Sequence, residues 1–185
     1  MKILILGAGG TGGYFGGRLH QAGADVTFLL REKRARQIAA EGLRIESTKN
    51  SVTLRVNTVL ANAVKPEYDL IILSCKAYDL DAGINAITPA MASNTCHTCI
   101  VPLLNGISHI DTLDAAFGKS RVMGGSCQIA ATLTMDGIVK SMLDVQSIVW
   151  GGREGSQDAL AQKLGEAFAN TTIDWRVSEN IMQDM

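Results

Sequence analysis

Residues Gly7-Ala8-Gly9-Gly10-Thr11-Gly12 fit the pattern G-x-G-x-x-G and follow a short apolar run, residues 2–6 (Lys-Ile-Leu-Ile-Leu). Between a buried strand and a helix, the first glycine of this pattern permits a tight turn. The second lets a pyrophosphate approach the backbone, and the third lets the helix pack close to the sheet. The helix N-terminus offers unpaired N–H groups to the phosphates. The segment therefore predicts a dinucleotide site formed by residues 7–12.

A glycine-rich turn without a ligand is the alternative interpretation. The glycines continue into the expected helix as Gly12, Gly13, Gly16 and Gly17. Four glycines in one helix cost on the order of 3 to 4 kcal/mol relative to alanine. Because a helix accepts such a cost where something must come close to it, we favour dinucleotide binding.

Strand and helix signals alternate from this segment to about residue 120. The expected strands are 2–6, 24–30, 69–74 and 99–104, with 43–46 and 52–59 as an exposed antiparallel pair or edge strands; the expected helices are 11–22, 32–41, a segment ended by Pro89, and one from a Ser108 cap to Gly118. This alternation is typical of an open parallel sheet with helices on both faces.

The pattern changes after residue 120. Segments 122–134, 138–143 and 147–150 predict consecutive strands, with Asp136-Gly137 as a hairpin turn, before a helix over 157–169 and a strand over 172–177. The expected fold class is α/β: a Rossmann-type doubly wound, mostly parallel sheet with a few antiparallel strands in its C-terminal part. Ser178 would cap a further helix that has no visible end, so we expect residues 178–185 to begin a truncated second domain.

Composition excludes several classes of function. The chain has 185 residues, with 17 Lys and Arg against 18 Asp and Glu, and a net charge of -1. This balance argues against nucleic-acid binding through bulk positive charge. No apolar run approaches the roughly 18 residues of a membrane span, and no export signal is recognisable. We therefore expect a cytoplasmic protein with no nucleic-acid or membrane partner, whose four cysteines are thiols.

The second strand indicates which dinucleotide is bound. NAD sites usually place an acid at the end of this strand to hold the ribose 2′-OH, whereas here Arg31 occupies or neighbours that position. A guanidinium can hold a 2′-phosphate with paired hydrogen bonds. Glu32 is the competing ribose acid, and the bases that follow, Lys33, Arg34 and Arg36, read as a solvated helix face. We favour NADP(H), with Arg31 as the clamp and residues 1–177 as the NADP-binding domain.

Two polar residues follow the next buried strands. Lys76 comes after Leu73-Ser74-Cys75, and Asn105 comes after Pro102-Leu103-Leu104. Ligands of doubly wound sheets bind beyond the carboxyl ends of the strands. Lys76 could neutralise a phosphate or a substrate carboxylate, and Asn105 could bind the nicotinamide ribose and a carbonyl substrate. The alternatives are a surface lysine and a simple Asn-Gly turn.

Together these residues resemble the ketopantoate reductase (2-dehydropantoate 2-reductase) family along essentially the whole chain. The shared motifs, in order, are Gly7 to Gly12 with Gly16, Arg31, Ser74-Cys75-Lys76-Ala77-Tyr78, Leu104-Asn105-Gly106-Ile107 and Met123-Gly124-Gly125. The resemblance implies an N-terminal Rossmann domain and an all-helical C-terminal domain. It further implies reduction of ketopantoate to pantoate with NADPH, a step toward pantothenate and coenzyme A.

The resemblance also implies roles for individual residues. Gly7 to Gly12 would hold the pyrophosphate, Arg31 the 2′-phosphate, and Lys76 would line the cleft. Asn105 would contact both cofactor and substrate, and Ala130 would touch the cofactor near the nicotinamide. The family's catalytic lysine would fall a few residues beyond Met185. We therefore expect this chain to bind NADPH weakly and to be inactive alone, with a 2-oxoacid substrate and a monomer or homodimer for the full-length protein.

Two alternatives stay open. One is a related NADP-dependent reductase of another 2-oxoacid or an opine-like compound, which the same cofactor half would serve. The other is a non-catalytic dinucleotide-sensing Rossmann module, although such a module has no reason to carry both Lys76 and Asn105.

The remaining reactive side chains read as structural. Cys96-His97-Thr98-Cys99 lacks the second Cys/His pair that a zinc site needs, so we expect no metal. Cys75 and Cys127 are expected to be small core residues, and His20 and His109 to have surface or cap roles. Trp150 and Trp175 are expected to be packing residues.

Overall fold

The parallel sheet forms as expected. The structure is a computed structural model that describes residues 1–92 and 98–185. Its first sheet contains β1 (Lys2–Leu6), β2 (Asp25–Leu29), β5 (Asn57–Val59), β6 (Leu70–Leu73) and β7 (Cys99–Pro102). They run parallel in the order β5-β2-β1-β6-β7. All four residues of β6 are buried, as in strands covered on both faces.

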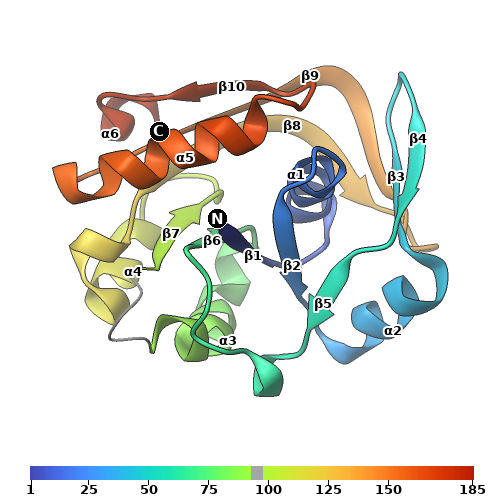
Figure 1. Cartoon of the computed structure of the whole chain (residues 1–185), viewed down its shortest axis with the longest axis horizontal. Helices are drawn as coiled ribbons and strands as arrows, with labels where there is room; N and C mark the ends of the chain where they lie inside the picture. The colour runs from blue at the N-terminus through green and yellow to red at the C-terminus, as the bar shows by residue number, and fades with distance from the viewer. Residues whose placement is uncertain (93–97) are drawn as a thin grey trace.

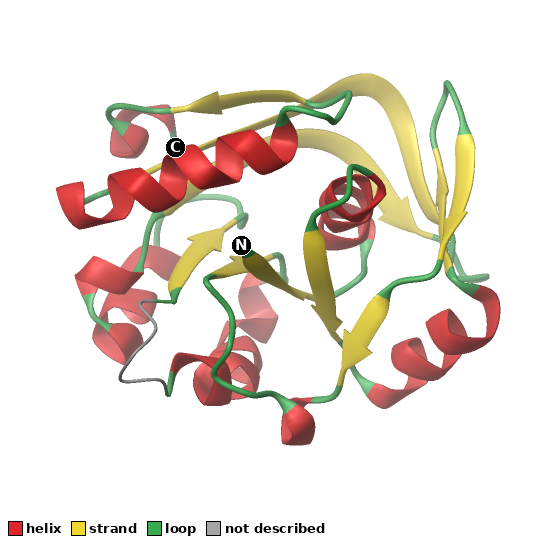
Figure 2. Ribbon diagram, viewed as in Figure 1, coloured by secondary structure: helices red, strands yellow, loops and turns green. Residues whose placement is uncertain are grey.

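Helices cover both faces of this sheet (Figure 2). On one face, α3 (Leu80–Met91) and α4 (His109–Phe117) pack their apolar side chains on β1, β6 and β7. On the other face lie α1 (Gly10–Gln21) and α5 (Asp158–Phe168). The fifth long helix, α2 (Glu32–Glu41), follows β2 and buries Ile38. The doubly wound α/β fold is therefore confirmed.

A second, mixed sheet covers α1 and α5 from outside (Figure 1). It contains β3 (Leu43–Glu46), β4 (Ser51–Leu54), β8 (Gly124–Leu133), β9 (Val139–Gly151) and β10 (Asp174–Val177). The order is β10-β9-β3-β4, and β8 pairs antiparallel with β9. The molecule therefore has four layers: the mixed sheet, α1 with α5, the parallel sheet, and α3 with α4.

Helix α1 has glycines where it contacts the two sheets, because both sheets lie too close to it for larger side chains. A Cβ on Gly13 would lie 2.7 Å from Val139 Cγ2 of β9, and one on Gly16 would lie 2.8 Å from the Phe28 ring of β2. A Cβ on Gly17 would collide with Ile45 of β3. These glycines are therefore required by protein packing, and their cost does not by itself indicate a ligand.

Several expected elements differ in the structure. Segment 52–59 divides: β4 pairs antiparallel with β3, whereas β5 joins the parallel sheet beside β2. Segments 138–143 and 147–150 are a single long strand, β9, because a register shift opposite Ile129/Ala131 absorbs the irregularity between them. The hairpin turn is confirmed, with Gly137 at φ 75°.

The structure differs from the expectation at the ends of three helices. Pro89 lies inside α3, which runs on to Met91; the two residues after the proline, Ala90 and Met91, are both buried, so packing favours the longer helix. Ser108 is the N-cap residue of α4, as expected, but it has helical backbone angles and its side chain makes no cap bond. Ser178 precedes a short helix, α6 (Ile181–Asp184), whose N-cap is Asn180; the Ser178 hydroxyl instead accepts the Asn180 N–H at 3.1 Å.

Short 3-10 turns complete the fold at η1 (Ala61–Ala63), η2 (Ala77–Asp79), η3 (Lys119–Arg121) and η4 (Gly155–Gln157). Within the described ranges, every helix is too short or too polar to cross a bilayer.

Candidate functional site

The glycine-rich segment forms an open loop between β1 and α1. Gly7 has φ +93°, a backbone conformation that L side chains rarely adopt, and its N–H donates to Leu29 O at 3.0 Å. Around the Cβ position of Gly9 there is open space, with no atom within 4 Å among the described residues. No side chain caps the N-terminus of α1. The loop thus has the shape that a pyrophosphate needs, with an accessible backbone and uncapped helix N–H groups.

Neighbouring strands hold this loop in place. The Ser74 hydroxyl, just after β6, donates to Leu6 O at 2.8 Å. A Cβ on Gly12 would collide with that hydroxyl and would lie 2.6 Å from Gly7 O, so the third glycine of the pattern is needed for close packing. A Cβ on Gly10 would lie 2.5 Å from Ala131 O of β8. The loop is therefore in close contact at Gly10 and Gly12, whereas the Cβ position of Gly9 stays open among the described residues.

Ala130 lies on β8 at the register shift between Ile129 and Ala131. Its neighbour Ala131 is the residue whose carbonyl faces Gly10. The structure therefore brings the residue after Ala130 into contact with the glycine loop.

Arg31 lies at the carboxyl end of β2, as the N-cap of α2. Its side chain is 80% exposed, and Nη2 is 2.9 Å from Asp79 Oδ1 on η2. Because β1 lies between β2 and β6 in the sheet, this ion pair joins the two strands that flank the glycine loop. Asp79 was not predicted as a site residue; its only signal in the sequence is its position three residues after Lys76.

The basic residues after Arg31 were expected to form one solvated helix face, but Arg34 departs from this expectation. Lys33 and Arg36 are exposed, and Arg36 pairs with Glu32 along the helix. That pairing also engages the Glu32 carboxylate, the competing ribose acid. Arg34, in contrast, is partly buried and donates to Ala8 O of the glycine loop at 3.1 and 3.3 Å. Its position four residues before Ile38, the buried residue of α2, was the signal that could have revealed this orientation.

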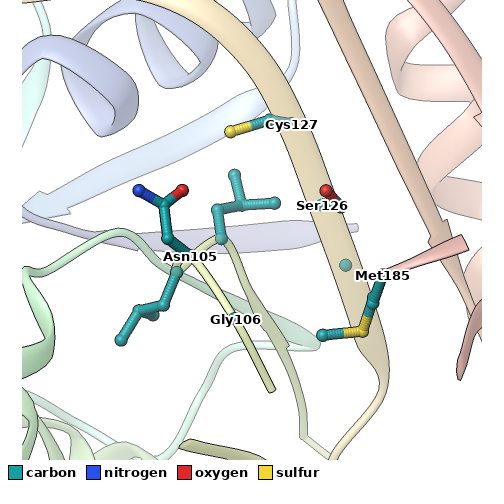
Figure 3. Close-up of a pocket in the computed structure, with 8 residues that line it drawn as sticks. Asn105, Gly106, Ser126, Cys127 and Met185 are labelled. Carbon is teal, nitrogen blue, oxygen red and sulfur yellow. The ribbon is translucent and has the colours of Figure 1, made fainter. Parts of the chain in front are cut away.

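Lys76 and Asn105 follow the neighbouring strands β6 and β7, and both side chains are exposed. Asn105 lines a cavity of about 170 Å³ together with the residues Leu103, Leu104, Gly106, Gly125, Ser126, Cys127 and Met185. Figure 3 shows Asn105 and Gly106 on one side of this cavity, with Ser126 and Cys127 of β8 and Met185 on the other. Lys76 is not part of this lining. The structure therefore brings Asn105 to a cavity, while Lys76 stays at the surface beside η2.

Burial makes the described thiols near the cavity unreactive. Burial raises the pKa of the Cys127 thiol to about 11, and it also raises that of Cys75. Such thiols are weak nucleophiles at neutral pH. Cys96 and His97 lie outside the described residues, and among those that are described no three His, Cys, Asp or Glu side chains gather as a metal site.

The expectation of a surface or cap role for His109 is wrong. The residue is 3% exposed, and burial lowers its pKa. Neither ring nitrogen has a partner in the described part of the chain. The imidazole is therefore a neutral side chain buried at the start of α4.

The tryptophans differ from each other. Trp150 is fully buried and donates its indole N–H to Ala161 O of α5 at 2.9 Å. Trp175 stacks on Trp150 with ring centroids 5.9 Å apart, yet stays 39% exposed. The packing role is thus clear for Trp150 and only partial for Trp175.

Comparison with known families gives one extended match. The model described as "Ketopantoate reductase PanE/ApbA" matches residues 3–155. An "Uncharacterized oxidoreductase YkpB" of Bacillus subtilis is 37% identical over the whole chain, which covers 60% of that protein. A 2-dehydropantoate 2-reductase of Lactococcus lactis is 31% identical over 98% of the chain and 58% of its own length. The chain thus spans about three fifths of the curated relatives that it matches.

Solved structures resemble the chain to a similar extent. A structure described as a putative 2-dehydropantoate 2-reductase of Enterococcus faecalis has a TM-score of 0.84 and 29% identity, over 100% of this chain and 59% of that one. A ternary structure of D-mandelate dehydrogenase with NADH and anilino(oxo)acetate has a TM-score of 0.85 and 30% identity, over 98% and 58%.

Proposed function

The chain belongs to the ketopantoate reductase family, and from this premise we propose that it is the cofactor-binding half of an NADPH-dependent reductase. The proposed reaction is the reduction of ketopantoate to pantoate on the way to pantothenate and coenzyme A. The open Gly9 face of the glycine loop, flanked by Arg31, is the observation that carries the proposal. In this interpretation residues 1–177 form the NADP-binding domain, and residues 178–185 begin a helical second domain.

Each residue has a distinct task in this proposal. Gly7 to Gly12 bind the pyrophosphate through backbone N–H groups, and Arg31 binds the 2′-phosphate with its fork of donors. Lys76 contributes positive charge beside the cleft. Asn105 orients the substrate carbonyl and the cofactor from the lining of the cavity, and Ala130 on β8 lies against the cofactor. When bound, the dinucleotide supplies the hydride.

The ketone oxygen gains negative charge during the reduction and needs a proton donor. Among the described residues that line the cavity, Cys127 is the one titratable side chain, and its raised pKa of about 11 makes it a weak acid. Lys76 is outside the lining. We therefore place the acid in the part of the full-length protein beyond Met185, as the family resemblance implies.

The cofactor preference is testable by titrating the full-length protein with NADPH and NADH. We expect tighter binding of NADPH, and we expect Arg31→Ala to weaken NADPH at least tenfold while changing NADH less than twofold. A charge-assisted bond is worth about 1.5–3 kcal/mol, and about 1.4 kcal/mol corresponds to tenfold. Arg36→Ala is the matched control, because Arg36 is an exposed arginine on the same helix that pairs only along it. Equal affinities for both cofactors, unchanged by Arg31→Ala, would contradict the proposal.

A second candidate is a reductase of a different 2-oxoacid. It is favoured by the similar structure of D-mandelate dehydrogenase, which contains NADH and anilino(oxo)acetate. Assays of the full-length protein with ketopantoate, benzoylformate and opine precursors distinguish these substrates. Tight binding of NADPH with no turnover of any 2-oxoacid would favour the sensing module instead.

Location and assembly complete the proposal. The free thiols of Cys75 and Cys127 fit a reducing compartment, and we propose the cytoplasm. A homodimer of the full-length protein is proposed from the family resemblance, and sedimentation of that protein tests it.

A further inference from the structure

Arg34 uses its whole guanidinium group to join two loops. Nε and Nη2 donate to Ala8 O at 3.3 and 3.1 Å, and Nη1 donates to Gly137 O at 2.9 Å. Nη1 also donates to Gln37 Oε1 at 2.8 Å, which holds the side chain on α2. Ala8 belongs to the glycine loop, and Gly137 belongs to the β8–β9 hairpin turn, 103 positions from Arg34. One partly buried cation therefore links segments that the sequence places far apart.

The hairpin turn is itself held firmly against α2 and β3. Gln37 Nε2 donates to Asp136 O at 3.1 Å, and Arg44 of β3 donates to the same carbonyl. A Cβ on Gly137 would collide with the Gln37 amide, so the turn is in contact with α2. Arg34 therefore connects the glycine loop to a turn that is itself fixed by hydrogen bonds.

Burial and the nearby Arg44 lower the pKa of Arg34. An arginine starts from so high a value that it stays protonated at any physiological pH. Its partly buried charge is compensated by two backbone carbonyl oxygens and the Gln37 amide oxygen. In the described part of the chain no carboxylate bonds to it, although the charge of Glu41 acts on it from a greater distance. A cation placed on the Ala8 carbonyl therefore adds positive charge behind the loop that would face the phosphates.

Peptide geometry determines how this contact affects ligand binding. In a planar trans peptide the C=O and N–H groups point in opposite directions. When Arg34 holds Ala8 O, the N–H of Gly9 in the same peptide must point away from Arg34. Gly9 is also the loop residue whose Cβ position is open. The orientation of this donor is thus set by a side chain that itself stands behind the loop.

We propose that Arg34 is a positioning residue for the pyrophosphate of the dinucleotide, acting through the Ala8–Gly9 peptide. This inference rests on the proposed function. It distinguishes Arg34 from Arg31, because a pyrophosphate is common to NADPH and NADH whereas the 2′-phosphate is not. Loss of Arg34 must therefore weaken both cofactors by the same factor and leave their ratio unchanged.

The test is calorimetric titration of the full-length protein with NADPH and with NADH. We expect Arg34→Met to weaken both at least tenfold, at an unchanged NADPH/NADH ratio. Arg34→Lys keeps the charge but cannot reach both carbonyls at once, so an intermediate loss is expected. If Arg34→Met does not fold, Arg34→Lys decides the outcome.

Arg121 provides the matched control. It also donates to two backbone carbonyls, Met91 O at 2.8 Å and Thr98 O at 3.1 Å, but at the amino end of β7, opposite the glycine loop. Arg121→Met should lower the melting temperature and leave both affinities within twofold.

The possible outcomes separate the two proposals. Wild-type protein that binds neither cofactor overturns the proposed function and this inference with it. Wild-type binding with unchanged affinities in both Arg34 variants overturns only the positioning role. A changed NADPH/NADH ratio also overturns it, because Arg34 would then contact the 2′-phosphate directly.

Discussion

Two adjacent glycines of the loop serve different purposes. Gly9 has φ −85° and no neighbour within 4 Å of its Cβ position among the described residues. Gly10 is blocked, because a Cβ there would lie 2.5 Å from Ala131 O and 2.8 Å from its carbonyl carbon. One glycine is required by the fold, and the other is left free by it.

Gly9→Ala is therefore expected to fold normally and to lose the cofactor. Its unfolding free energy should stay within about 0.5 kcal/mol of wild type, while NADPH affinity falls at least tenfold because the new methyl group occupies the pyrophosphate contact. Urea denaturation and calorimetry measure the two quantities. Gly155→Ala, at an exposed glycine whose Cβ has ordinary space, is the control that should change neither. Undiminished NADPH affinity in Gly9→Ala would exclude Gly9 from the binding site.

Asp79 competes for Arg31. Its carboxylate lies 2.9 Å from Arg31 Nη2, so a 2′-phosphate must displace it or share the guanidinium. Exposed pairs of this kind are worth about 0.2–1 kcal/mol. We expect Asp79→Asn to strengthen NADPH binding about two- to fivefold and to leave NADH unchanged, as measured by fluorescence titration. Weaker NADPH binding in this variant would mean that Asp79 orients Arg31 instead of competing for it.

At the scale of single residues, the sequence was most informative about the glycine loop, where backbone groups and not side chains form the surface. The spacing of Gly7, Gly9 and Gly12 predicted a loop whose geometry the structure reproduces. It did not reveal Arg34, because a basic residue on an amphipathic helix has the same local signal whether it faces solvent or a loop from another part of the fold. The contacts that orient Arg34 come from residues 26 and 103 positions away.

At the scale of elements, α4 is joined to the loop after β9 by an ion pair. Arg153 Nη1 and Nη2 contact the two Asp114 carboxylate oxygens at 2.7 and 2.8 Å. The two side chains are only 9% and 22% exposed. The hydrogen bonds from Arg153 hold the pKa of Asp114 below its ordinary value of 3.8.

A carboxyl group whose pKa is lower in the folded than in the unfolded protein stabilises the fold at pH values above its unfolded pKa. This stabilisation is lost as the pH falls from the unfolded pKa through the folded pKa. We therefore expect Asp114→Asn to cost about 1–3 kcal/mol at pH 7, the range for hydrogen bonds between charged groups. The difference from wild type should shrink below about pH 4, in urea denaturation at pH 7 and pH 3. Glu166→Gln, at an exposed carboxylate of α5, should cost less than about 0.5 kcal/mol at either pH. A pH-independent difference for Asp114→Asn would contradict the assignment.

The elements most accurately predicted were those with purely local signals, such as β1, α2 and β3, whose bounds matched. The errors occurred where pairing partners decide the outcome. β5 belongs to the parallel sheet because it pairs with the edge of β2. β9 continues through its irregular middle because β8 pairs with it both before and after the register shift. A short stretch of sequence does not reveal which strand will pair with it, so neither pairing could be predicted from local patterns.

At the scale of the whole molecule, two sheets enclose α1, and the candidate site lies where they meet. The parallel sheet contributes the loop after β1 and the ends of β2, β6 and β7, while the mixed sheet contributes β8. The sequence predicted the first sheet and its loops well. It could not predict that β8 would press on Gly10, because that contact depends on how the two sheets pack.

If the proposed function is right, the cavity beside Asn105 is only part of the reaction site. Met185 contributes to its lining together with Ser126 of β8, as Figure 3 shows. The remaining two fifths of the relatives' length lie outside the matched part. Cys127 has the one titratable side chain of the described lining, since the Ser126 hydroxyl and the Asn105 amide donate hydrogen bonds but do not titrate in the ordinary pH range.

We therefore expect a protein of residues 1–185 to bind NADPH weakly and to give no oxidation of NADPH with ketopantoate, whereas the full-length protein gives both. In the proposed function, binding depends on the glycine loop and Arg31, which lie within these residues, whereas turnover also needs an acid, which we have placed beyond Met185. Fluorescence titration and the decrease in NADPH absorbance measure the two properties on each protein. Catalysis by the shorter protein would place the acid within residues 1–185 and would make Lys76 and Cys127 the residues to substitute next.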